Sequence, residues 1–171
     1  VCTGGSFTVA PLWYVETVAG SSVRGTKDGI GKAANLETVQ HLAMGPDGKV
    51  WFTSRGGAGT DAIRTLDPKT WEVKTVIGID NALIKNTHPW GSTFDSKGNY
   101  YATGKAAGKV FKIAAGTNEI SVLSLPAHKL TTNPMCVLTD AQDNLYLLNR
   151  DAGTEAKPSY ISVYDKNLVL K

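Results

Sequence analysis

The stretch Gly45-Pro46-Asp47-Gly48-Lys49-Val50-Trp51-Phe52-Thr53-Ser54 joins a tight turn to a short strand-forming run. Pro46 presets the backbone φ angle for a turn, and Gly48 accepts a positive φ at no steric cost. The β-branched and aromatic residues at 50–53 are typical of a β-strand. Taken alone, the stretch predicts one β-hairpin.

The same turn and strand recur twice along the chain. They return at residues 95–103, Asp-Ser-Lys-Gly-Asn-Tyr-Tyr-Ala-Thr, and at residues 140–148, Asp-Ala-Gln-Asp-Asn-Leu-Tyr-Leu-Leu. With Gly48, Gly98 and Asp143 as equivalent positions, the spacing is 50 and then 45 residues. Repeats of this length built from strands indicate stacked β-sheet units, above all the blades of a β-propeller. The predicted fold is therefore all-β.

Composition and charge agree with one globular β-rich domain. Of the 171 residues, 42% are hydrophobic and 19% are charged, which is ordinary for a folded domain. A net charge of +3 implies no strong field for nucleic acid or membranes. Cys2 and Cys136 do not make a disulfide framework or a metal cluster. No apolar run approaches the roughly 20 residues that cross a bilayer, so no membrane span is expected.

The repeats divide the chain into segments. Residues 1–12 carry no repeat signal and are predicted to be an N-terminal tail or the end of a preceding domain, whereas residues 13–171 are predicted to form blades. The three blades are expected at 36–78, 87–125 and 133–171. The strands of the first blade are expected at 41–44, 50–53, 62–67 and 71–76, and those of the second at 91–94, 100–103, 109–113 and 119–123. The strands of the third are expected at 136–139, 145–148, 160–164 and 168–171. Residues 13–20 match residues 71–78, so an outer strand of a preceding blade is expected there.

Residues throughout 13–171 resemble NHL-repeat β-propeller proteins. The resemblance rests on Val18-Ala19-Gly20, Gly25, Asp28-Gly29, Ala33, Pro46-Asp47-Gly48 with Val50-Trp51-Phe52, Ala62-Ile63-Arg64, residues 71–76, Pro89-Trp90-Gly91 and Pro134. It implies four-stranded blades and says little about function, since propellers host binding modules and enzymes alike. The chain departs from the family where an Asp usually follows the second strand, because Ser54, Gly104 and Asn149 stand there.

The number of predicted blades raises the question of how the ring closes. Propellers close with about four to eight blades, and three blades plus one outer strand are fewer. Either the chain is a portion of a longer protein, or two copies associate so that three blades meet three more. We expect a portion of a longer protein, with a six-bladed homodimer as the alternative.

Innermost strands line the channel of a propeller, so residues where they begin are candidates for binding. They include His41 in the first blade, His88 and Trp90 in the second, and Asn133 in the third. His41, Gly91 and Cys136 fall at one shared level. There His41 and Cys136 are either ligands of a channel metal or, as we expect, a hydrogen-bonded His and a buried thiol. No metal site and no cofactor are predicted.

A second set of candidates follows the second strand of each blade. Arg55, Lys105 and Arg150 are equivalent, and Asn149 precedes the last of them. Three cations at one level are either a basic arc for a carboxylate or phosphate or solvated loop residues. Trp90 near the channel adds an aromatic ring that can stack on a sugar.

Three functions are compatible with these patterns. The first is a non-catalytic, extracytoplasmic binding module for a glycan or protein partner. Residues 5–9, Gly-Ser-Phe-Thr-Val, which are similar to the closing strand of immunoglobulin-like TIG domains of bacterial surface proteins, favour this setting. The alternative is a metal-dependent lyase or lactonase with further ligands in other blades. RNA binding through the basic arc is the third, and a nucleic-acid partner is not expected.

Overall fold

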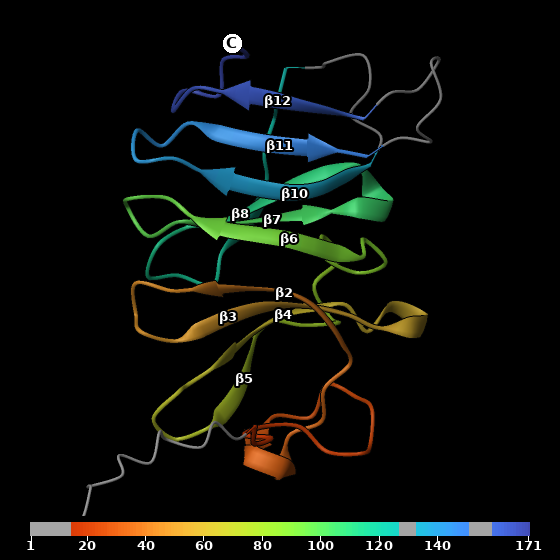
Figure 1. The fold of residues 1–171 in the computed structure, drawn as a ribbon. Coiled ribbons are helices and arrows are strands. Elements are labelled where there is room, and N and C mark those ends of the chain that lie inside the picture. The colour runs from red at the N-terminus through yellow and green to blue at the C-terminus, as the bar shows by residue number, and fades with distance from the viewer. Residues whose placement is uncertain (1–14, 127–132, 151–158) are drawn as a thin grey trace, which may run out of the picture.

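The computed structural model describes residues 15–126, 133–150 and 159–171, which form three antiparallel sheets (Figure 1). Blade 1 has the order β1-β5-β4-β3-β2, from β1 (Gly29–Ile30), β2 (Thr38–Met44), β3 (Val50–Arg55), β4 (Ala62–Leu66) and β5 (Glu72–Ile77). Blade 2 comprises β6 (Pro89–Phe94), β7 (Tyr100–Gly104), β8 (Lys109–Ile113) and β9 (Ile120–Val122), and blade 3 comprises β10 (Pro134–Thr139), β11 (Leu145–Asn149) and β12 (Tyr160–Tyr164). Short 3-10 helices η1 (Gly31–Ala33), η2 (Gly57–Gly59) and η3 (Lys105–Ala107) lie in the connections.

The repeated turns have the geometry that the sequence predicts. Gly48 N–H donates to the Gly45 carbonyl at 3.0 Å, and the equivalent bonds from Gly98 and Asp143 are also 3.0 Å long. The φ angles at these three turn residues are +74°, +80° and +61°. Asp143 therefore adopts the left-handed region that glycine occupies in the other two turns, as short polar side chains occasionally do. The three turns confirm the equivalence on which the repeat was based.

Two of the predicted strands are absent or shortened in the described residues. Residues 15–20 form no strand, and residues 13–14 lie outside the described part of the chain. The edge beyond β5 is occupied instead by β1, in which Gly29 pairs with Val73. An outer strand needs the rest of its own blade to pair with, and residues 15–126 contain no other strand of such a blade. At the other end, the strand expected at 168–171 is reduced to one bridge between Tyr164 and Leu170.

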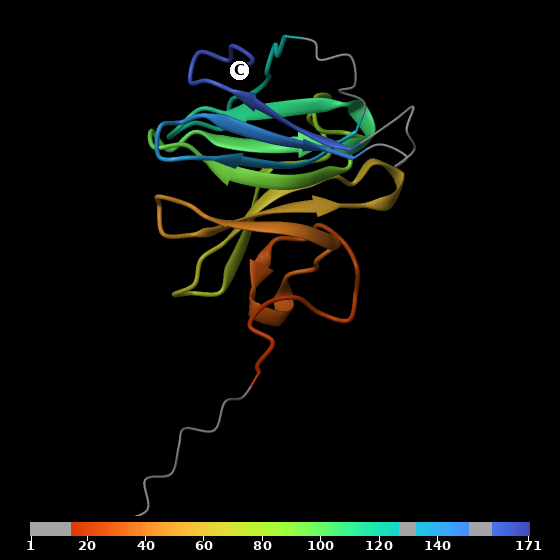
Figure 2. The same cartoon turned by 45° about the horizontal axis from the view of Figure 1, so that its top comes forward.

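The chain before β2 is anchored to blade 1 by a buried arginine. The Arg64 side chain is fully buried and donates to the Asn35 carbonyl at 2.8 Å, the Lys27 carbonyl at 3.0 Å and Asp28 Oδ1 at 3.0 Å. Partial burial opposes ionisation of the Asp28 carboxyl, but hydrogen bonds from Thr75 and Arg64 outweigh it and lower its pKa. Residues 15–37 consequently lie against one outer face of the stack (Figure 2).

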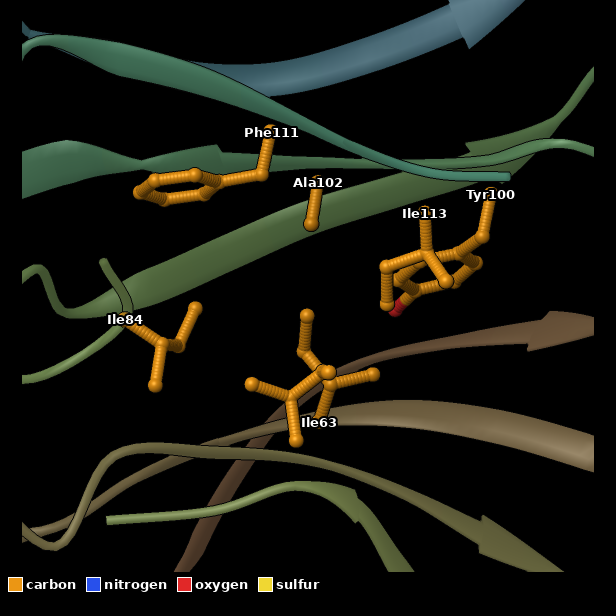
Figure 3. Close-up of a cluster of buried hydrophobic side chains, with 7 residues drawn as sticks. Ile63, Ile84, Tyr100, Ala102, Phe111 and Ile113 are labelled. Atoms are coloured by element: carbon orange, nitrogen blue, oxygen red, sulfur yellow. The ribbon is translucent and has the colours of Figure 1, made fainter. Parts of the chain in front are cut away.

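The hydrophobic core lies between consecutive sheets. Ile63 of β4 and Ile84 of the connection meet Tyr100, Ala102, Phe111 and Ile113 of blade 2 (Figure 3). Trp51 extends this cluster with ring centroids 5.5 Å from Phe94 and 5.0 Å from Tyr100. A second cluster, which includes Val110, Val137, Leu147 and Tyr164, joins blades 2 and 3. Since burying one large apolar side chain contributes roughly 1.5–3 kcal/mol, face-to-face packing holds the blades together.

Candidate functional site

One end of the stack gathers most of the candidate residues. Pairing of Thr38 with Arg55, of Pro89 with Gly104 and of Pro134 with Asn149 places the beginning of each innermost strand beside the end of the second strand of its blade. We call this the loop end. It carries η2 and η3 and lies at the right of Figure 1. The candidates where the innermost strands begin and the candidates after the second strands therefore lie at the same end of the molecule.

Arg55 and His88 line one pocket at the junction of blades 1 and 2. We call it the cationic pocket. It has a volume of about 340 Å³ and is lined by Arg24, Thr38, Arg55, Gly56, Gly57, Gly59, Asn86 and His88. Arg55 is exposed, and no carboxylate in the described residues forms an ion pair with it. Arg24 bonds to Glu37 at 2.9 Å and to Thr38 Oγ1 at 3.3 Å. The lining therefore offers the unpaired guanidinium of Arg55 to a ligand, whereas the guanidinium of Arg24 is shared with Glu37.

A buried carboxylate shapes the wall of the cationic pocket. Asp61 is fully buried and accepts hydrogen bonds from Gly56 N–H at 3.2 Å and His88 N–H at 2.9 Å. His88 adopts a positive φ of 51°, which is uncommon for a residue with a side chain. Asp61 therefore ties the loop after β3 to the segment that precedes β6. Its only signal in the sequence is its place at the head of Asp61-Ala62-Ile63-Arg64.

Trp90 and Lys105 stack on one another. The Lys105 ammonium lies 4.6 Å from the centre of the Trp90 ring, a distance at which the cation is attracted by the π face. The Trp90 carbonyl accepts a hydrogen bond from Thr53 Oγ1 at 2.5 Å, which fixes the backbone between blades. One face of the Trp90 ring is thus engaged by a cation, so a sugar that stacks on that face must displace Lys105.

Asn133, Asn149 and Arg150 lie at the loop end of blade 3. The Asn133 carbonyl accepts from Arg150 N–H at 3.1 Å, and the Arg150 side chain is exposed. Asn149 is only 1% exposed, and its amide donates to the Leu147 carbonyl at 3.4 Å. The structure therefore places Asn149 inside the sheet packing, whereas Arg150 faces solvent. Arg24, which the sequence reasoning did not single out, joins the pocket from the polar connector before β2.

His41 lies at the inner junction of blades 1 and 2. Ser92 N–H donates to His41 Nδ1 at 3.3 Å, and Ser92 Oγ is 3.1 Å from the same nitrogen. Burial lowers the pKa of His41. Because Nδ1 accepts from a backbone N–H, the neutral imidazole is the form that fits the junction. The expectation of a hydrogen-bonded His at this level agrees with the contact, whereas the Cys136 thiol, expected to be buried, is only half-buried.

We predict that His41 makes stability depend on pH. The stabilisation from the neutral ring is complete above its unfolded pKa of about 6.5 and is lost as the pH falls through the lowered folded pKa. Urea unfolding of the wild type and of His41→Gln should be compared between about pH 8 and pH 5. The wild type should lose more stability than the variant over this interval. Parallel pH profiles would show that His41 is not the group that titrates.

The described residues contain no set of three His, Cys, Asp or Glu side chains placed to hold a metal ion. Within the same residues, no helix is long and apolar enough to cross a membrane.

Solved structures show which fold the chain has. No family model and no curated protein sequence matches the chain. The fold is similar to virginiamycin B lyase from Staphylococcus aureus (TM-score 0.56, 17% identity), over 78% of this chain and 40% of that one. It is also similar to the calcium-binding protein regucalcin from Agrobacterium tumefaciens (TM-score 0.60, 13% identity), over 78% of this chain and 43% of that one. A chain of a nidogen–laminin complex is similar as well (TM-score 0.60, 18% identity), over 80% of this chain and 47% of that one.

This structural similarity identifies the fold of the chain as a partial β-propeller. It spans less than half the length of each of these three propeller proteins. Since the group includes enzymes and binding proteins, the shared fold leaves the function to be argued from the site.

Proposed function

We propose that the chain is part of an NHL-type propeller that serves as a non-catalytic, extracytoplasmic binding module for an acidic glycan or protein partner. The observation that carries the proposal is the cationic pocket, where Arg24, Arg55 and His88 line a hollow between two blades. The TIG-like residues 5–9, which favour the extracytoplasmic setting, lie outside the described part of the chain.

The chemistry of the cationic pocket fits a carboxylate. A guanidinium presents several N–H donors in a planar fork that matches the two oxygens of a carboxylate. The N–H donors of the exposed Arg55 side chain are available to a ligand, because no carboxylate in the described residues forms an ion pair with this side chain. At about 340 Å³, the pocket is at the small end of the range for ligand sites. One uronic acid residue or one acidic side chain has a suitable size.

The lining favours binding over catalysis. The buried carboxylate next to the pocket, Asp61, accepts two backbone N–H groups and faces the loop that it organises. Glu37 is already paired with Arg24. General acid–base chemistry on a sugar needs a carboxyl group or His within hydrogen-bond reach of the reacting atoms. His88 is the one pocket residue of this kind, and we assign it to holding the ligand.

Neutralising Arg55 tests the proposal. Wild-type protein, Arg55→Gln and Lys69→Gln are titrated calorimetrically with a uronate oligosaccharide and, separately, with a glutamate-rich peptide. Lys69 is exposed in the turn after β4, at the opposite end of the sheets, so it matches the change in charge. Loss of a charge-assisted bidentate contact should weaken binding about tenfold or more in Arg55→Gln. Lys69→Gln should bind like the wild type.

The outcomes separate the hypotheses. Binding of neither probe, or equal affinity for both variants, contradicts an acidic ligand in this pocket. A preference for one probe decides between glycan and protein. If instead single-stranded RNA binds and its affinity falls steeply with salt, the basic arc is a nucleic-acid site. Turnover of a lactone or cyclic ester that is abolished by a chelator would favour the enzymatic alternative.

A further inference from the structure

Blade 3 presents an apolar surface on the side away from blade 2. Its strands alternate, with Val137, Leu147 and Tyr164 buried against blade 2. On the opposite side Leu138 is 60% exposed, Leu148 40% and Ile161 66%. The pairing of Cys136 with Leu148, Leu148 with Ile161, Leu138 with Tyr146 and Tyr146 with Val163 makes these side chains neighbours across the sheet. We call these six residues the blade 3 face: Cys136, Leu138, Tyr146, Leu148, Ile161 and Val163.

Blade 1 presents a second apolar surface at the other end of the stack. Val39, Leu42 and Met44 of β2 pair with Ser54, Phe52 and Val50, so they share one side of the sheet. They are 39%, 61% and 66% exposed. Residues 15–37 cover the outer part of this side, where Arg64 holds them, and leave β2 uncovered. We call Val39, Leu42 and Met44 the blade 1 face.

The two faces are the two halves of a junction that the chain already makes twice. At the junction of blades 1 and 2, His41 meets Ser92 at 3.1 Å. At the junction of blades 2 and 3, Thr93 meets Thr139 at 3.2 Å.

The repeat spacing shows which residues of the blade 3 face and the blade 1 face correspond to these contact pairs. It makes His41 equivalent to Cys136 and Ser92 equivalent to Leu42. It likewise makes Thr93 equivalent to Leu138 and Thr139 equivalent to Met44. A third junction of the same geometry would therefore place Leu138 on Met44 and Cys136 on Leu42.

We propose that two copies of this chain pack head to tail, the blade 3 face of each on the blade 1 face of the other, and close a six-bladed ring. One chain carries both complementary surfaces, and a head-to-tail interface makes a discrete particle when its rotation closes. The hydrogen-bonded pairs of the internal junctions are replaced by apolar pairs, as is common in permanent homodimers.

Ring closure would also extend the candidate site. Arg150 of one copy occupies the position of Arg55, and Thr38 of the other copy occupies that of His88. Each new junction would then bring a cation of one copy beside the start of β2 in the other, where Arg24 already lies. The loop end would carry cations at every junction of the ring.

Variants that introduce a charge into each apolar face test the interface directly. The 171-residue chain and the variants Leu138→Lys, Met44→Glu and Val122→Lys are measured by size exclusion with light scattering. The wild type should have about twice the 18.2 kDa of one chain. Leu138→Lys and Met44→Glu bury an unpaired charge at both junctions, so each alone should be monomeric, with dimer affinity lowered about 100-fold or more. Val122, 39% exposed on the outer strand of blade 2, is the control and should leave the dimer intact.

Mixing the two monomeric variants should restore the dimer. In the mixed ring one junction is unchanged, and the other pairs the introduced lysine with the introduced glutamate. A wild-type monomer, an open-ended oligomer, or a mixture that stays monomeric would overturn the proposal. The first of these is expected if a further blade of a longer chain covers the two faces instead.

A cross-link checks the register independently of charge. In a Cys2→Ser background, Leu42→Cys should form an intermolecular disulfide with the native Cys136 on mild oxidation, whereas Val122→Cys should not. The product is a covalent dimer on a non-reducing gel. A chain that dimerises without this cross-link would show that another surface is used.

Discussion

Replacing Arg64 by alanine is expected to lower the free energy of unfolding by about 3–5 kcal/mol. The side chain is fully buried, lies 5.8 Å from the centre of the Phe52 ring and donates to two backbone carbonyls and Asp28. Truncation leaves the carbonyls of Lys27 and Asn35 without these donors and opens a cavity, and each of these changes destabilises the folded chain.

The measurement is urea unfolding at fixed protein concentration, and the chain supplies a matched control. Arg24 also pairs with a carboxylate, Glu37 at 2.9 Å, but its side chain is 70% exposed. Arg24→Ala should therefore cost no more than about 1 kcal/mol. Equal losses in the two variants would show that residues 27–35 are not held to blade 1 by Arg64. Asp28→Asn should in addition reduce the loss of stability in acid, because the lowered pKa of Asp28 contributes stability above about pH 4 that is lost as the carboxyl protonates.

The repeat made most of the fold predictable. The turns at Gly48, Gly98 and Asp143 and the strands that follow them recur with fixed local chemistry, so they could be found without any partner. The prediction of an outer strand at residues 13–20 rests on a sequence match to residues 71–78, and such a match does not provide the neighbouring strand that the segment needs. In the structure Gly29–Ile30 pairs with β5 instead.

The candidate site was predictable only in part, for a physical reason. Repeat equivalence identifies residues at one level of the propeller, and it located Arg55 and His88 at the loop end. It contains no information on contacts made by the irregular connections. Arg24 reaches the pocket from a polar connector, and Asp61 acts through backbone donors that have no side-chain signature. The burial of Asn149 likewise depends on packing between sheets.

A methyl group added at Gly91 is expected to destabilise the protein by about 3 kcal/mol, near the upper end of the usual range for overpacking. Gly91 lies in β6, where the innermost strands of blades 2 and 3 meet. A Cβ atom there would be 2.5 Å from Cys136 Cα and 2.8 Å from the Met135 carbonyl oxygen. Both neighbours are backbone, so no side-chain rotation can relieve the overlap. The strands β6 and β10 must separate.

Gly57→Ala is the control for Gly91→Ala. Gly57 is exposed, and a Cβ atom there would meet nothing within 4 Å. The free energy of unfolding of the Gly57→Ala protein should stay within about 0.5 kcal/mol of the wild-type value. Separation of β6 from β10 would also lengthen the contacts that Thr103 and Thr93 make with blade 3, so amide exchange should accelerate in β10 before it does in β4. A Gly91→Ala protein as stable as Gly57→Ala would mean that the two inner strands do not pack at this distance, and the register transferred to the blade 3 and blade 1 faces would fail with it.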